Sequence, residues 1–387
     1  MKSSTPLGHL QVDEFLSQYW QKKPLLIKQA FPDISNPVSA DELAGLACDE
    51  EVESRIVLEK DGTHPWELRS GPFTESDFAK LPHTHWTLLI QDIEKHLPEL
   101  AYIASAFDFI PDWRMDDLMF SYAPLHGSVG PHVDAYDVFL LQTQGQRHWQ
   151  INTQIDGSAD MLDNTDLRIL SYFDNEEDWI LEPGDMLYLP PGVAHYGVAL
   201  GDCITCSIGF RAPSHQGLVQ SYLHSVLEGI DKNIMYSDPG LKRQQHPHEL
   251  TQENISALKQ TVEQYLTLNP HELHHWLGSA LSEAKEQFQI DPLADPLSAS
   301  EWMDQWQRDG ILYRNTALKF LFINNTRNIT LFVNGEPFEL PQGHFERAES
   351  LCSSLQINWD EWESAPDNKQ LAEILYQFYC NGYYYLA

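Results

Sequence analysis

The chain has 387 residues, of which 42% are apolar, and it carries 57 acidic against 24 basic side chains. The apolar content supports more than one domain with a sizeable core, so the composition excludes a globally disordered chain. The formal net charge of −33 disfavours direct binding to the phosphate backbone of DNA or RNA and suits a basic protein partner.

The cysteine content and the hydropathy pattern predict the cellular compartment of the protein. Five cysteines in a chain of this length do not indicate a disulfide framework. The N-terminal segment contains charges and lacks the apolar stretch of a secretory signal. No apolar run is long enough to span a membrane. The sequence therefore predicts a reduced, cytoplasmic protein with no membrane association.

The first half of the chain is predicted to be rich in short strands. Ser39 and Glu42 fit a capping box that begins a helix. From about 54 to 210, β-rich runs alternate with Gly/Pro turns, a pattern typical of a sandwich or barrel. The β-rich runs are Ile56–Leu58, Trp86–Ile90, Leu118–Tyr122, Val138–Leu141, Met186–Leu189 and Ile204–Ile208.

The segment from 214 to about 290 has helical periodicity with an unusually wide apolar stripe. A stripe this wide exceeds what one neighbouring helix covers, so we expect a homodimer interface. The alternative is that helices predicted at 249–287 of the same chain cover the stripe entirely. The stripe consists of Leu218, Tyr222, Val226 and Ile230, flanked by Val219, Leu223 and Leu227.

A last module follows a Pro-containing linker at 291–296. Ser298 and Glu301 fit a second capping box, for a helix that ends near Gly310. Asn334-Gly335 is a strong hairpin signal between strands. Helices with a small hairpin over this length indicate a winged helix. Basic residues are few in it, so packing or substrate docking is favoured over DNA binding.

The segment Gly130–Leu141 carries the strongest chemical signal. Residues two apart on a strand point to the same face. His132 and Asp134 are therefore expected to project together, with Val133 facing away. An imidazole and a carboxylate side by side supply two neighbouring metal ligands.

His195 is the candidate for a third ligand. It lies 61 residues beyond Asp134 and follows a Pro191-Gly192 turn that closes another predicted strand. Two histidines and one carboxylate on one face of a metal leave open positions, as in non-haem Fe(II) oxygenases. The ordinary alternative for any one of these histidines is a surface or satisfied core residue, but the combination favours the metal.

Two further residues are candidates near this site. Arg147 follows a predicted turn at Gln144–Gln146 and shares a strand face with Trp149. An arginine among large apolar groups is costly unless it meets an anion, and a dicarboxylate fits its two-pronged guanidinium. Tyr136 shares the face of Asp134 and could meet a cationic substrate, or it could simply pack at the rim of the barrel.

His132, Asp134 and His195, together with the opening Phe15…Tyr19-Trp20-Gln-Lys-Lys-Pro-Leu-Leu-Ile-Lys28, resemble the JmjC-type ribosomal oxygenases, and most closely the bacterial ribosomal protein arginine hydroxylases. The resemblance spans nearly the whole chain. It implies an α+β fold: a double-stranded β-helix (cupin/JmjC) barrel, a helical dimerisation region and a C-terminal winged helix. The corresponding segments are 1–212, 213–295 and 296–387.

The resemblance also implies the chemistry. His132, Asp134 and His195 match ligands of Fe(II), Arg147 matches the residue that binds the distal carboxylate of 2-oxoglutarate, and Ser121 matches a hydroxyl of the same cosubstrate site. The family uses O₂ to hydroxylate a ribosomal protein; in its bacterial members the target is an arginine Cβ of the large-subunit protein L-sixteen.

Two alternatives are compatible with the same residues. The machinery could act on a histidine or a methyl-lysine of another basic protein. The barrel could instead be a non-catalytic cupin-like binding module whose metal is structural.

Overall fold

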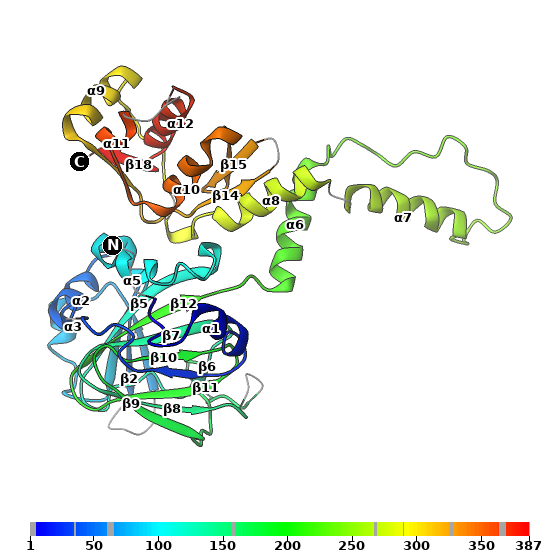
Figure 1. Cartoon of the computed structure of the whole chain (residues 1–387). Coiled ribbons are helices and arrows are strands. Elements are labelled where there is room, and N and C mark those ends of the chain that lie inside the picture. The colour runs from blue at the N-terminus through cyan, green and yellow to red at the C-terminus, as the bar shows by residue number, and fades with distance from the viewer. Residues whose placement is uncertain are drawn as a thin grey trace. The chain divides into compact units, whose positions relative to one another are not determined.

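A computed structural model describes the chain except residues 1–4, 35, 60–65, 156–158, 164, 267–268, 289, 326–327, 364–368 and 387. The chain divides into two compact units, Met1–Ala212 and Pro213–Ala387 (Figure 1). Among the described residues, no helix has the length and apolar character needed to cross a membrane. The two units are described separately below.

The N-terminal unit is built on two antiparallel sheets, and the larger one has eight strands. All six β-rich runs predicted from the sequence lie within its strands. In spatial order these strands are β1 (Leu25–Ile27), β10 (Met186–Leu189), β7 (Asp137–Gln144), β12 (Cys203–Phe210), β5 (Met115–Ala123), β4 (Trp86–Ile90), β2 (Ser54–Glu59) and β3 (Trp66–Ser70).

The second sheet of this unit has four strands and, with the first, completes the barrel. In spatial order these strands are β6 (His132–Val133), β11 (Ala194–Ala199), β8 (Arg147–Asn152) and β9 (Glu177–Leu181). The mixed fold with a strand-rich barrel that the sequence predicted is thereby confirmed.

Short helices pack against the larger sheet. They are α1 (Val12–Gln18), α2 (Ala40–Leu46), α3 (Glu75–Phe78), α4 (Ile93–His96) and α5 (Ala101–Ser105), with 3₁₀ turns at Pro98–Leu100 and Asp112–Arg114. The capping box of Ser39 and Glu42 is present at the start of α2, as predicted. Helix α1 buries only Phe15, whose ring centroid lies 5.0 Å from that of Tyr188 in β10. This aromatic contact packs the N-terminal helix on the outer face of the larger sheet and leaves the barrel interior to other residues.

The C-terminal unit begins with helices and ends with two small sheets. Its helices are α6 (His215–Gly229), α7 (Gln252–Leu266), α8 (Pro270–Ser282), α9 (Ala299–Asp309), α10 (Phe345–Ser353), α11 (Trp359–Glu363) and α12 (Lys369–Cys380), with 3₁₀ turns at Glu286–Phe288 and Gln342–His344. Its sheets have the spatial orders β17 (Gln356–Asn358), β13 (Ile311–Arg314), β18 (Tyr384–Leu386) and β14 (Phe320–Asn324), β15 (Asn328–Val333), β16 (Glu336–Pro341).

The predicted signals of the winged helix are present. Ser298 and Glu301 form the capping box of α9, and Gly310 ends that helix with a left-handed φ of 80°. Asn334 and Gly335 join β15 to β16 with φ angles of 50° and 79°, values that suit a type I′ hairpin turn. The capped helix and the hairpin predicted for the last module are therefore both present.

Helix α8 packs closely on the sheet of β14, β15 and β16. A Cβ atom on Gly278 of this helix would lie only 2.3 Å from the ring of Phe332 in β15, so only glycine permits this approach. Helix α8 thus contacts the winged-helix sheet although it lies within the predicted helical region 213–295. The boundary at 295 remains a prediction.

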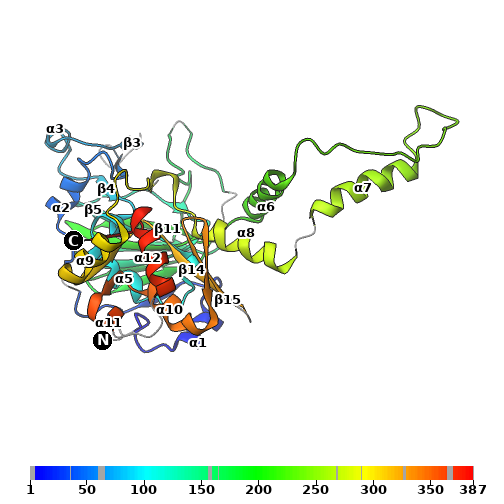
Figure 2. The same cartoon turned by 90° about the horizontal axis from the view of Figure 1, so that it is seen from above.

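Helices α6 and α7 differ from the rest of the unit. None of their described residues is buried. Most of α7 extends away from α6 after a long connecting segment, in both views (Figures 1 and 2). The two helices touch near the C-terminal end of α7, where the Tyr222 hydroxyl donates a hydrogen bond to the Leu266 carbonyl at 2.8 Å. Their apolar side chains consequently remain largely exposed.

Candidate functional site

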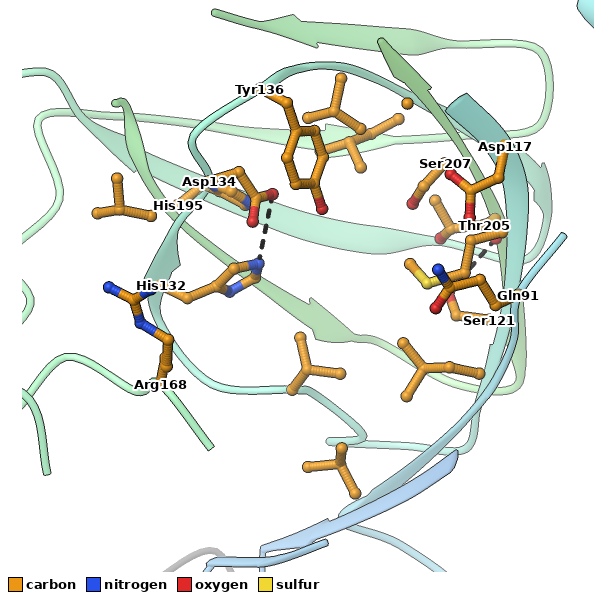
Figure 3. A pocket seen from close by; sticks show the side chains of 18 of the residues that line it. Gln91, Asp117, Ser121, His132, Asp134, Tyr136, Arg168, His195, Thr205 and Ser207 are labelled. Carbon is orange, nitrogen blue, oxygen red and sulfur yellow. Dashed lines mark hydrogen bonds and ion pairs between the residues drawn. The ribbon is translucent and has the colours of Figure 1, made fainter. Parts of the chain in front are cut away.

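A cavity of about 860 Å³ opens between the two sheets of the N-terminal unit. Every site residue predicted from the sequence lines it. These residues are Ser121, His132, Asp134, Tyr136, Arg147 and His195. Strands β5, β6, β8 and β11 and the segment before β7 therefore bring together side chains from four separate stretches of sequence (Figure 3).

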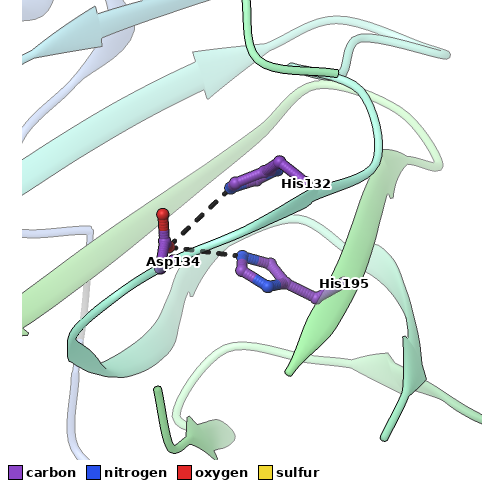
Figure 4. A group of neighbouring side chains, drawn as sticks. All are labelled: His132, Asp134 and His195. Carbon is purple, nitrogen blue, oxygen red and sulfur yellow. Dashed lines mark ion pairs between the residues drawn. The ribbon is translucent and has the colours of Figure 1, made fainter. Parts of the chain in front are cut away.

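His132, Asp134 and His195 form a compact group in this cavity, which we call the triad (Figure 4). Their ligand atoms all lie within 4.8 Å of one another. The Asp134 carboxylate is 3.8 Å from Nε2 of His132 and 3.6 Å from Nε2 of His195. His132 and His195 are direct partners in the pairing of β6 with β11, which places the two imidazoles side by side on one face.

Asp134 reaches the triad differently from the way the sequence predicted. Strand β6 ends at Val133, so Asp134 lies in the connection to β7 rather than on a strand. Its carbonyl accepts a hydrogen bond from the Gly192 N–H at 2.8 Å. The Pro191-Gly192 turn therefore holds the connection in place. His132 and Asp134 lie together as expected, but Asp134 does so from a connection and not from the strand that the sequence predicted.

Backbone carbonyls orient both imidazoles. Nδ1 of His132 is 2.9 Å from the Gly130 carbonyl, and Nδ1 of His195 is 3.0 Å from the Val193 carbonyl. A carbonyl only accepts, so in the neutral ring Nδ1 carries the proton and the Nε2 lone pair points toward Asp134. Such hydrogen bonds are typical behind metal-bound histidines.

Burial keeps His195 neutral. The side chain is almost fully buried, and desolvation followed by the neighbouring His132 lowers its pKa to about 4. A neutral imidazole at physiological pH has the free lone pair that a metal requires. The two imidazoles and the carboxylate therefore fit a divalent metal such as Fe(II), with positions left open for other ligands.

Arg147 is buried in the cavity wall without hydrogen-bond partners for its Nε and one terminal nitrogen within the described part of the chain. Its guanidinium lies 5.7 Å from the centroid of the Trp149 ring, on the same face of β8. The turn before it needs Gly145, which has a φ of 65° and where a Cβ would lie 2.2 Å from the Asp202 carbonyl. A buried cation with unused donors indicates an anion-binding site.

Ser121 lies on β5 directly opposite Thr205 of β12. Its hydroxyl donates to the Thr205 carbonyl at 3.3 Å, and the Thr205 hydroxyl donates to the Gln142 side chain at 2.9 Å. Ser121 is thus a buried hydroxyl on the cavity wall whose lone pairs remain available to accept. Its contact with a cosubstrate remains a prediction.

Two further residues line the cavity: Tyr136, just before β7, and Asp117, on β5 (Figure 3). Burial, and then the charge of Asp134, raises the pKa of Tyr136, so the phenol stays protonated. Asp117 is 8% exposed and was not among the predicted residues. The alternation along β5 could have identified it, because Asp117, Met119 and Ser121 are two residues apart and all line the cavity. The sequence prediction began this strand at Leu118, after Asp117, and so missed it.

Comparisons with known proteins match both units. Residues 102–218 match the family model of the JmjC domain, and residues 257–385 match that of the ROXA-like winged helix. The chain is 32% identical to the ribosomal protein uL16 3-hydroxylase of Escherichia coli, over 96% of each chain. It is 33% identical to a probable ribosomal oxygenase of Haemophilus influenzae, over 96% of this chain and 94% of that one.

A solved structure matches along the whole length as well. It is that of YcfD, a ribosomal oxygenase from Escherichia coli in complex with cobalt and 2-oxoglutarate. The TM-score is 0.81 at 31% identity, with 97% of this chain and 98% of that chain covered.

Proposed function

The chain belongs to the JmjC-type ribosomal oxygenase family, and we propose that it is an Fe(II)- and 2-oxoglutarate-dependent hydroxylase of an arginine Cβ in the ribosomal protein uL16. The observation that carries the proposal is one cavity holding both the triad and the unpaired Arg147 guanidinium. The similarity to a uL16 3-hydroxylase over nearly all of both chains supports the choice of substrate.

The triad would hold the iron through two Nε2 atoms and one carboxylate oxygen. Bound Fe(II) would activate O₂ and couple its reduction to decarboxylation of 2-oxoglutarate, giving succinate, CO₂ and a hydroxylated substrate. The protein's contribution is to hold these reactants in one geometry. Gly130 and Val193 fix the imidazoles through their carbonyls before any ligand arrives.

Arg147 would bind the distal carboxylate of 2-oxoglutarate, because its unused N–H groups suit a two-pronged contact with a carboxylate. Ser121 would add a hydroxyl contact on the opposite sheet. Val138, Leu140 and Trp149 line the same region and would exclude water from the cosubstrate.

The target arginine would approach past Tyr136 and Asp117. A protonated phenol and a nearly buried carboxylate offer a guanidinium an aromatic face and a charged acceptor. The overall charge of −33 would also attract a basic ribosomal protein. We further propose that the enzyme works in the cytoplasm, where ribosomal proteins meet ribosomes.

We also propose a homodimer that uses the stripe on α6. Val219, Leu223 and Leu227 are 56%, 41% and 67% exposed, so the helices of the same chain do not cover them. An apolar groove beside the stripe has a volume of about 260 Å³ and is lined by Leu218, Val219, Tyr222, Leu266, Leu273 and Trp276. A second copy related by a two-fold axis would bury both.

The proposed activity can be tested by supplying the purified protein with Fe(II), 2-oxoglutarate and uL16 fragments. We expect succinate formation and the gain of one oxygen atom on an arginine Cβ, located by fragment mass spectra. Fragments in which that arginine is replaced by histidine or methyl-lysine should not be oxidised. Oxidation of the replacements alone would favour the related hydroxylase or demethylase, and no succinate with any fragment would favour a binding module.

A further inference from the structure

Arg211, the first residue after β12, covers one face of the Tyr136 ring. Its guanidinium carbon lies 5.2 Å from the ring centroid, a cation–π distance. Its Nε is 2.8 Å from the Asp116 carboxylate, which is 12% exposed. Both Arg211 and Tyr136 line the barrel cavity. One face of the Tyr136 ring therefore contacts a cation that is itself fixed by an ion pair.

The backbone of Arg211 is anchored as well. Its carbonyl accepts a hydrogen bond from Nε of Arg114 at 3.0 Å. Arg114 in turn pairs with the fully buried Asp137 at 3.1 Å, and Asp137 follows Tyr136 directly in the chain. Two successive contacts through Arg114 thus connect the end of β12 to the start of β7.

Asp116 and Asp117 are neighbours on β5 but make different contacts. Asp117 lines the cavity, whereas Asp116 lies where the pairing with β12 shifts register and forms an ion pair with Arg211. Asp117 lies opposite Gly209 in the register with β12, two residues before Arg211. The Arg211–Asp116 ion pair therefore ties the two strands together beside the carboxylate that faces the cavity.

We propose that Arg211 is a positioning residue for the peptide substrate. Held by Asp116, its guanidinium fixes the Tyr136 ring so that the phenol and Asp117 face an incoming guanidinium together. This inference rests on the proposed function, because it takes the substrate to be an arginine side chain. Arg211 itself does not touch the triad or the cosubstrate region around Arg147.

The sign of the effect separates positioning from plain electrostatics. Removing Arg211 deletes a positive charge near the substrate route and breaks its ion pair with Asp116. Charge alone therefore predicts tighter binding of a cationic peptide. Positioning predicts weaker binding, because the Tyr136 ring loses the cation that orients it.

The test compares Arg211→Gln with Arg69→Gln, a matched control. Arg69 forms an ion pair with Glu67 at 2.7 Å on β3 and does not line the cavity. For Arg211→Gln we expect the KM for a uL16 fragment to rise about two- to fivefold, with more succinate formed per hydroxylated arginine and an unchanged KM for 2-oxoglutarate. Arg69→Gln should change none of these.

Two additional variants and a binding measurement complete the test. Arg211→Lys keeps the charge over the ring and should recover part of the lost affinity, and Asp116→Asn should weaken it. Calorimetric titration of the metal-free protein with the fragment gives the affinity without turnover. Unchanged or tighter binding by Arg211→Gln would overturn the positioning role. A wild-type protein that binds the fragment but hydroxylates no arginine would instead contradict the proposed function.

Discussion

The barrel of the N-terminal unit buries polar groups, whereas helices α6 and α7 of the C-terminal unit expose apolar ones. Arg147 is 3% exposed and two of its nitrogens have no hydrogen-bond partner among the residues that the structure describes, while Leu227 and Val262 are 67% and 57% exposed. Both arrangements cost free energy in the isolated chain. Each is therefore expected where a second molecule binds, a small anion in the barrel and another apolar surface at the helices.

The two costs differ in size. A buried charge without a partner costs several kcal/mol, whereas one apolar side chain left in water forgoes only about 1.5–3 kcal/mol. In the barrel, the unfavourable free energy comes from a few side chains around one cavity. In α6 and α7 it is distributed over many exposed apolar side chains. Single substitutions should consequently have large effects in the barrel and smaller effects along α6.

Replacing His132 or Asp134 by Ala should have the largest effect. Each variant removes one of three proposed ligands, so turnover of the uL16 fragment should fall below detection while the fold is kept. The matched control is His148→Ala, on β8, whose imidazole faces Asp178 at 3.4 Å and does not line the cavity. Turnover in either triad variant equal to that of the control would contradict the assignment.

Arg147→Ala should act mainly on the cosubstrate. Losing a charge-assisted contact of ~1.5–3 kcal/mol should raise the KM for 2-oxoglutarate by roughly ten- to a hundredfold. Arg147→Lys should recover only part, because an ammonium lacks the planar fork. Steady-state kinetics at varied 2-oxoglutarate concentration measures both. An unchanged KM in Arg147→Ala would move the carboxylate site elsewhere.

A second substitution of Arg147 tests its contribution to the stability of the fold. Arg147→Met replaces an unpaired buried cation by an apolar side chain of similar length. The free energy of unfolding of the ligand-free protein should therefore stay equal or rise, although cosubstrate binding is lost. Urea unfolding without 2-oxoglutarate tests this, and a large loss of stability would mean that Arg147 serves the fold rather than a ligand.

Leu223→Glu should split the proposed dimer. A carboxylate buried without a partner disfavours association, so sedimentation equilibrium should give a species of 44.4 kDa instead of twice that mass. His224→Glu, on the polar side of α6, adds the same charge and should leave the dimer intact. A wild-type protein that stays at 44.4 kDa throughout the micromolar range would rule the dimer out.

Asp185→Asn, away from the cavity, should affect stability alone. Burial raises the pKa of Asp185, but hydrogen bonds from Lys28 and from the Gln29 and Glu182 backbone outweigh it, so the pKa is lowered on balance. A depressed carboxyl pKa adds stability above its ordinary value, which is lost as the pH falls through the folded-state value. The variant should cost about 1–3 kcal/mol at neutral pH and progressively less below about pH 4; a constant difference across that range in urea unfolding would contradict this.

Much of this architecture follows from local sequence signals. The capping boxes of Ser39 and Ser298 and the Asn334-Gly335 turn depend on a few neighbouring residues, and all occur where the sequence predicts them. His132 and Asp134 could also be proposed from the sequence, because residues two apart in an extended segment lie on the same side of the chain.

What could not be predicted depends on the pairing of distant segments. Asp117 faces the cavity only because β5 starts at Met115 and places Asp117 opposite Gly209 of β12, beside a shift in the register. The contact of Arg211 with Tyr136 joins residues 75 positions apart that no local pattern connects. The packing of Gly278 on Phe332 similarly needs the sheet to exist before the helix can dock on it.

The central claim is that the barrel hydroxylates an arginine of uL16, and mass spectrometry of ribosomal proteins tests it most directly. Ribosomes are purified from cells that make this protein, from cells that lack it and from cells that carry His132→Ala. We predict that uL16 gains one oxygen atom on an arginine Cβ only in the first. Identical uL16 masses in all three, or an added oxygen that persists without the protein, would contradict the claim.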